Sequence, residues 1–142
     1  RRQRQMCIRD RPYDGIPQLL TALKKRGIQV AVLSNKIDSA SQQLIEYFFP
    51  GKTDVVFGEH VGVPRKPDPT SCRMVMQQLG VQPEQVLYVG DSGTDMQTAK
   101  NAGLYAVGVT WGFRSKEVLL KYGADVLVHR PEQILQILDS DE

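Results

Sequence analysis

The stretch VLYVGDSGTD, residues 86–95, decides the fold. Its first four residues are aliphatic or aromatic, which is typical of a short strand buried inside a sheet. Gly90 and Asp91 follow at once, and Asp95 stands four residues further on, where a helical pattern begins that Gly103 ends. The stretch therefore predicts a strand–turn–helix unit with two aspartates beside the carboxyl end of the strand.

The rest of the chain repeats this alternation of strands and helices. Strands are predicted over residues 28–33 (IQVAVL), 54–57, 86–89, 105–109 and 125–128, and helices over 16–26, 38–49, 69–79, 94–102, 115–122 and 131–138. Asp14 is expected to cap the first helix, and Gly27 to end it. This order predicts an α/β, Rossmann-like parallel sheet with helices on both faces, whose ligands sit at the carboxyl ends of the strands.

Composition is that of one globular domain. The chain has 142 residues, of which 41% are hydrophobic and 24% charged, and no apolar run approaches the roughly 20 residues of a membrane span. Two cysteines, Cys7 and Cys72, lack a metal-binding or disulfide spacing. We expect a cytoplasmic protein that does not bind membranes.

The basic charge is concentrated at the start of the chain. Residues 1–11 (RRQRQMCIRDR) contain five arginines and one aspartate, whereas the remainder has 13 basic and 15 acidic residues. Because the arginines have no interleaved aromatic residues and no basic helix behind them, we expect no nucleic-acid partner. We interpret 1–11 as a leader foreign to the domain, and 12–142 as a partial core domain.

Three further polar groups follow or precede regular elements. Ser34 and Asn35 leave the strand over residues 28–33, and Lys66 lies in the sequence RKPDP just before a helix. A hydroxyl, an amide and a mobile ammonium can all donate to the oxygens of a phosphoryl group. Asp91 and Asp95 provide the hard oxygen ligands that magnesium prefers. Taken singly, each has an ordinary reading as a helix cap, turn or surface residue; His60 is only a faint candidate for substrate contact.

The set of motifs resembles the haloacid-dehalogenase superfamily. Ser34 in VLSNK, Lys66 in KPDP, and Asp91 and Asp95 in GDSGTD are similar to its second, third and fourth motifs. Three stretches, VLSNK, KPDP and VTWGFRS (residues 109–115), are particularly like the phosphoglycolate phosphatases. The resemblance implies a magnesium-dependent phosphate-monoester hydrolase that acts through an aspartyl phosphate on a small phosphorylated organic acid such as 2-phosphoglycolate. Ser34 and Asn35 would bind the phosphoryl group with Lys66, which would neutralise its charge, and Asp91 and Asp95 would hold Mg²⁺.

The chain departs from that family in one respect. The first motif, DxDxT after an apolar strand, supplies the nucleophile, and neither it nor the usual cap domain occurs in this sequence. In the family that strand lies between the strands that carry Ser34 and Asp91, so we expect a gap in the sheet and an inactive fragment. The alternatives are a phosphosugar phosphatase or phosphoglucomutase relative, a non-catalytic phosphate- or partner-binding module, and a receiver-like domain, which lacks a suitable phosphoacceptor here. The sequence does not determine the oligomeric state.

Overall fold

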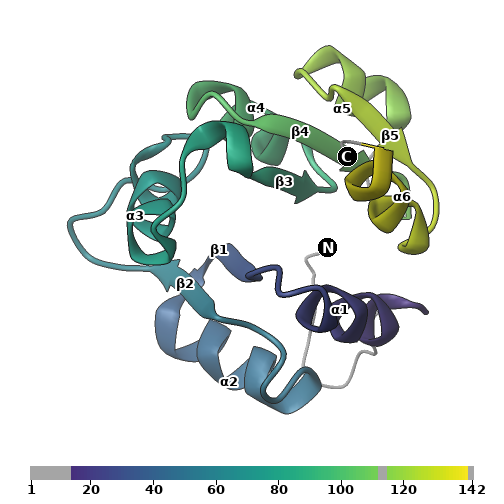
Figure 1. The fold of residues 1–142 in the computed structure, drawn as a ribbon. Helices are drawn as coiled ribbons and strands as arrows, with labels where there is room; N and C mark the ends of the chain where they lie inside the picture. The colour runs from purple at the N-terminus through teal and green to yellow at the C-terminus, as the bar shows by residue number, and fades with distance from the viewer. Residues whose placement is uncertain (1–13, 112–114, 141–142) are drawn as a thin grey trace.

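The computed structural model describes residues 14–111 and 115–140. In chain order the elements are α1 (Ile16–Lys25), β1 (Ala31–Ile37), α2 (Asp38–Phe48), β2 (Val55–Glu59), α3 (Thr70–Leu79), the 3₁₀ turn η1 (Pro83–Gln85), β3 (Leu87–Gly90), α4 (Gly93–Asn101), β4 (Tyr105–Val109), α5 (Lys116–Lys121), β5 (Val126–Val128) and α6 (Glu132–Ser140). The predicted alternation is confirmed (Figure 1). The leader 1–11 lies outside the described residues, as do residues 112–114 of the VTWGFRS motif.

All strand pairs are parallel, but they form two sheets. β1 pairs with β2, and β3, β4 and β5 form a second sheet in that order. Within the described part of the chain no ladder joins β1 to β3, which confirms the gap expected between these two strands. Figure 1 draws the two sheets as separate units, with the connection through α3 on one side.

Two hydrophobic cores cover opposite faces of β4. Ala106 lies in the first core with Met96 of α4 and Leu119 of α5, and all three are fully buried. The next residue, Val107, points to the other face, where it packs with Leu19 of α1 and with α6. Since neighbouring strand residues face opposite sides, helices cover both faces of this sheet, as the sequence predicts.

The helices also hold the two sheets together. Cys72 and Met76 of α3 belong to the first core together with Met96, and Leu33 of β1 packs against the same core. On the other face, α1 contacts α6. The first βα half of the chain is therefore packed against the second half by side chains, although no backbone ladder connects them.

Two expectations about local structure were wrong. β1 begins later and runs further than residues 28–33, to Ile37, because the ladder shifts register after Leu33 and resumes with Ile37 opposite Glu59. The residues of β1 are partly buried or exposed, and among the described residues its second edge pairs with no strand. Gly15 rather than Asp14 occupies the N-cap of α1, with φ of 91°, a left-handed conformation that glycine adopts readily.

Across the described residues, no helix has the length and apolar character needed to cross a bilayer.

Candidate functional site

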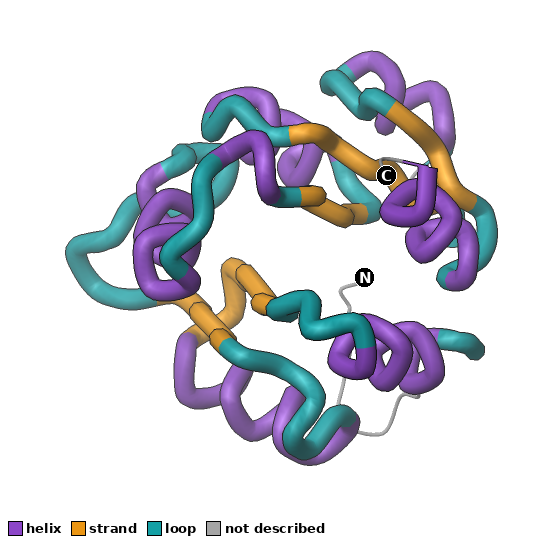
Figure 2. Tube along the Cα trace, in the orientation of Figure 1, coloured by secondary structure: helices purple, strands orange, loops and turns teal. Residues whose placement is uncertain are grey.

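The predicted site residues come from both sheets. Ser34 and Asn35 lie in the second half of β1, Asp91 follows β3 directly, and Asp95 is in the first turn of α4. Lys66 lies in the long connection between β2 and α3, which Figure 2 draws as a loop. These positions are all near the carboxyl ends of parallel strands, where ligands bind in open α/β sheets.

Lys66 and Asp95 form a buried ion pair. The ammonium Nζ of Lys66 lies 2.8 Å from Oδ1 of Asp95, and the two side chains are only 11% and 13% exposed. The same ammonium donates to the backbone oxygen of Leu33 in β1, at 3.2 Å. Lys66 thus bridges the two sheets at a point close to Ser34.

The carboxylate of Asp95 is also fixed from its own helix. Its Oδ2 accepts hydrogen bonds from the backbone N–H of Asp91 at 3.2 Å and from the hydroxyl of Ser92 at 3.0 Å. Ser92 is the N-cap of α4, and its Oγ accepts in turn from the N–H of Asp95. A Cβ on Gly90 would stand 2.3 Å from the Cβ of Asp95, so only glycine leaves room for this arrangement. Both oxygens of Asp95 are therefore engaged by donors.

The environment of Asp95 is poorly solvated. Burial, together with the negative charge of Asp95, raises the pKa of the Tyr88 hydroxyl well above its ordinary value, and a hydrogen bond with Thr98 opposes the shift. The side chains of Lys66 and Asp95 are themselves only 11% and 13% exposed, so their ion pair is weakly screened by water.

Ser34 and Asn35 make different contacts. The hydroxyl of Ser34 accepts the N–H of Lys36 at 3.0 Å, which leaves its own O–H available to donate. Oδ1 of Asn35 accepts the backbone N–H of Lys66 at 3.2 Å, and its backbone oxygen accepts from Arg65 at 3.4 Å. Asn35 is therefore linked to the loop that carries Lys66.

His60 lies beside the beginning of α2. Its Nδ1 is 2.9 Å from the backbone oxygen of Gly58, and its Nε2 is 3.7 Å from Asp38. Asp38 also accepts the N–H of Gly58, and this hydrogen bond is the main reason why the pKa of Asp38 is lowered. A Cβ on Gly58 would stand 2.5 Å from Cα of Asp38, so the ends of β1 and β2 need glycine to approach this closely. The contacts of His60 fix it locally and do not join it to Lys66.

Sequence reasoning missed two residues that support the site. Ser92 caps α4 and binds Asp95; the spacing Ser-x-x-Asp, which resembles a capping box, is a signal that could have identified it. Asn101, at the end of α4, donates to the backbone oxygen of Pro67 at 2.9 Å and so ties the lysine loop to the second sheet. No sequence pattern marks Asn101, because the contact depends on the tertiary arrangement.

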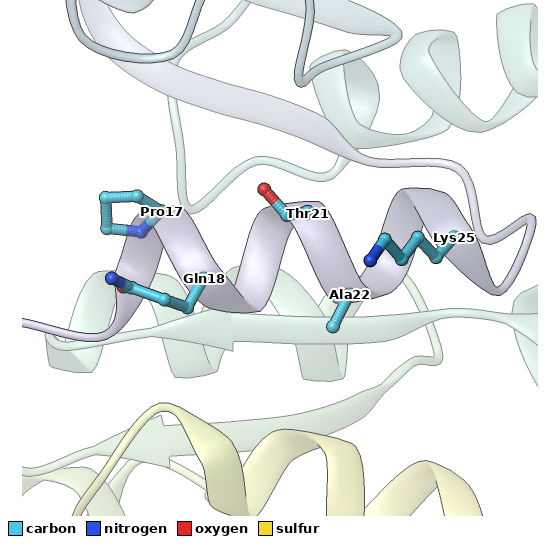
Figure 3. Close-up of a pocket in the computed structure, with 5 residues that line it drawn as sticks. All are labelled: Pro17, Gln18, Thr21, Ala22 and Lys25. Atoms are coloured by element: carbon cyan, nitrogen blue, oxygen red, sulfur yellow. The ribbon is translucent and has the colours of Figure 1, made fainter.

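A surface hollow elsewhere has no connection to these residues. It follows α1 and is lined by the side chains of Pro17, Gln18, Thr21, Ala22 and Lys25, which come from successive turns of the helix (Figure 3). None of the predicted site residues lines it. The candidate site is therefore defined by the polar contacts at the strand ends.

The described residues include candidate ligands for a metal ion. They contain no group of three or more His, Cys, Asp or Glu side chains placed to hold a metal ion. Asp91 and Asp95 are hard oxygen donors, and Mg²⁺ commonly takes one or two protein carboxylates and completes its shell with water and phosphate oxygens. The carboxylate of Asp95 is held by Lys66 and Ser92, so a metal ion at this oxygen would compete with both donors.

The fold and the site define a doubly wound α/β domain with a lysine–aspartate pair at its strand ends. The chain belongs to the haloacid dehalogenase-like hydrolase family, whose model matches residues 5–109. This match begins within the segment 1–11.

Curated relatives include phosphatases. The chain is 32% identical over 142 residues to N-acetylmuramic acid 6-phosphate phosphatase of Pseudomonas aeruginosa, an alignment that covers 98% of the chain and 62% of the relative. It is 30% identical over 131 residues to phosphoglycolate phosphatase of Aquifex aeolicus, which covers 92% of the chain and 60% of the relative. The chain thus spans about three fifths of the length of these relatives.

Solved structures agree with the fold. A predicted phosphoglycolate phosphatase from Haemophilus somnus superimposes with a TM-score of 0.84 at 28% identity, covering 92% of this chain and 60% of that one. A provisionally assigned phosphoglycolate phosphatase from Lactobacillus delbrueckii subsp. bulgaricus gives a TM-score of 0.86 at 40% identity, covering 90% and 54%. The Rossmann-like fold of the haloacid dehalogenase-like hydrolases is therefore confirmed.

Proposed function

We propose that the protein containing this chain hydrolyses phosphate monoesters of small organic acids, with 2-phosphoglycolate as the representative substrate. The observation that carries the proposal is the buried pair of Lys66 and Asp95, which holds an ammonium between the end of β1 and the start of α4. Both curated relatives described above are named as phosphatases of phosphorylated acids. The proposal extends that class of substrate to this chain.

The roles follow from the chemistry of the donors. The hydroxyl of Ser34 and the ammonium of Lys66 would bind the non-bridging oxygens of the phosphoryl group, where negative charge spreads during transfer. Asp91 would hold Mg²⁺, with Asp95 orienting Lys66 and the loop around Asp91. When bound, the metal would supply charge neutralisation at the phosphoryl oxygens. The DxDxT motif, which supplies the carboxylate that receives the phosphoryl group in the family, does not occur in this sequence.

Asp91→Asn in the full-length protein tests this assignment. The substitution keeps the size of the side chain but removes its charge, so we expect weaker Mg²⁺ binding and a fall of at least about 100-fold in turnover of 2-phosphoglycolate, which corresponds to several kcal/mol of lost stabilisation. Asp54→Asn is the matched control, because Asp54 directly precedes β2 at the amino end of that strand, away from the carboxyl ends that carry the site. This variant should leave turnover unchanged. Unchanged turnover in Asp91→Asn would exclude the metal role.

A second reading is a non-catalytic module that binds a phosphate or a partner. Its support is that the sequence contains no DxDxT motif, and that Asp95 is engaged with Lys66 and Ser92. The same experiment separates the readings. A full-length protein that binds 2-phosphoglycolate but releases no phosphate with Mg²⁺ present would favour the module.

A further inference from the structure

We infer that Asn35 is a positioning residue that acts through Lys66, rather than a contact to the substrate. The inference rests on the proposed function only in that it takes Lys66 as the cation of the site. Its evidence is that the side chain of Asn35 accepts a hydrogen bond from the backbone of the very residue whose ammonium would bind phosphate.

Lys66 needs such an anchor because its surroundings are exposed. Its neighbours Pro64, Arg65 and Pro67 are solvent-exposed, and yet the ammonium of Lys66 is nearly buried against Asp95. A lysine side chain has many rotamers, so an ammonium stays at one point only when the backbone that carries it is fixed as well. Oδ1 of Asn35 is the acceptor that the described residues provide for the Lys66 N–H.

Asn35 and Leu33 fix the two ends of the same side chain. Oδ1 of Asn35 holds the backbone N–H of Lys66 at 3.2 Å, and the backbone oxygen of Leu33, two residues earlier in β1, holds its ammonium at 3.2 Å. The lysine is therefore aligned against the end of β1 over its whole length. The contact from Arg65 to the backbone oxygen of Asn35 is longer, at 3.4 Å, and holds the same loop more weakly.

The chemistry of the amide separates the two roles. Positioning uses only the oxygen of Asn35, whereas a contact to phosphate oxygens would use its N–H₂ donors. Aspartate keeps an oxygen acceptor of the same size and lacks the donors. Alanine lacks both. Asn35→Asp and Asn35→Ala are therefore a matched pair: positioning predicts that only alanine releases Lys66.

The test measures the reactivity of Lys66 in the 142-residue chain, without substrate. The chain is treated briefly with an amine-acetylating reagent, and acetylation at each lysine is measured by mass spectrometry. The Lys66 rate is divided by that of Lys25, which is exposed, and compared with Lys100, which is paired with Asp125. We expect Asn35→Ala to raise the relative rate at Lys66 roughly 2- to 10-fold, the population change produced by losing one hydrogen bond, with no rise at Lys100.

Each outcome either supports or overturns the positioning role of Asn35. Asn35→Asp should label like the wild-type protein, and Arg65→Ala should have a smaller effect than Asn35→Ala. Wild-type labelling of Lys66 in Asn35→Ala would overturn the inference, as would equal labelling in the two Asn35 variants. If Asn35→Ala unfolds, shown by a parallel rise at Lys100, Asn35→Leu replaces it as an apolar variant of similar size. Because no turnover is measured, failure of the inference is distinguishable from failure of the proposed phosphatase activity.

Discussion

Replacing Lys66 by methionine tests whether the buried ion pair holds the two sheets together. Methionine matches the length of lysine and preserves most of its apolar contacts, but it removes the charge. The carboxylate of Asp95, whose side chain is 13% exposed, then keeps the N–H of Asp91 and the hydroxyl of Ser92 but loses its cation. The variant leaves a buried negative charge without its counter-ion.

The expected loss follows from the geometry. At 2.8 Å and an effective dielectric constant of about 20, the Coulomb attraction is about 6 kcal/mol before the desolvation of both groups is subtracted. Breaking a buried pair by removing one partner typically destabilises a protein by about 3–5 kcal/mol. Because Asp95 retains two hydrogen-bond donors, we expect about 3 kcal/mol. In a domain of this size each kcal/mol lowers Tm by about 4 °C, so the midpoint should fall by about 12 °C.

The assay is thermal unfolding of the full-length protein at pH 7, followed by far-ultraviolet circular dichroism. Lys24→Met is the matched control, because Lys24 pairs with Asp54 at a similar distance of 2.9 Å with side chains 36% and 29% exposed. An exposed pair contributes at most about 1 kcal/mol, so this control should lose no more than about 4 °C. Lys66→Met combined with Asp95→Asn should be more stable than Lys66→Met alone. Equal midpoints for Lys66→Met and Lys24→Met would refute the reasoning.

Three other predictions concern the chain outside this pair. Hydrogen bonds from the backbone N–H of Val30 and then from Lys24 lower the pKa of Asp54 in the folded protein. The ionised Asp54 therefore adds to the free energy of unfolding above its unfolded pKa of about 3.9, and this stabilisation disappears as pH falls through the folded pKa. Asp54→Asn should therefore lower the urea midpoint at pH 7, by about 1 kcal/mol in free energy, and its effect should shrink as pH falls through the folded pKa. Gly58→Ala, which places a Cβ 2.5 Å from backbone of Asp38, should lose about 1–3 kcal/mol or more in the same urea assay, and an unchanged midpoint would contradict the contact. Finally, the isolated chain should melt over a broad temperature range in calorimetry, because β1 and β3 present unpaired edges to each other; a sharp two-state transition would contradict this.

The sequence predicted the architecture well because its signals are local and repeated. Short apolar runs such as residues 86–89 and 105–109 alternate with helical patterns that end at glycines such as Gly103, and that alternation determines a parallel sheet with helices on both faces. The limits of β1 were wrong for a non-local reason. Its extension past Leu33 to Ile37 depends on pairing with Glu59 after a register shift, and residues 34–36 carry no strand signal of their own.

The sequence identified candidate site residues within local stretches, but it did not predict the contacts between distant segments. Asp91 and Asp95 became candidates because both belong to one strand–turn–helix stretch, and Lys66 became one because it lies in RKPDP just before a helix, in a motif that resembles the third motif of the family. That Lys66 and Asp95 are in contact, 29 residues apart in sequence, could not be derived from either segment alone. The roles assigned to these residues remain proposals.

The arrangement of the contacts explains why one lysine can matter to both stability and function. The two sheets share no ladder in the described residues, so what joins them is side-chain packing above and below, and polar contacts at the strand ends. Lys66 makes two of those polar contacts, to Leu33 on one sheet and to Asp95 beside the other. Lys66 therefore supports the contact between the two sheets and, in the proposed function, supplies the cation of the site. A substitution that removes its ammonium should for this reason affect both stability and phosphate binding.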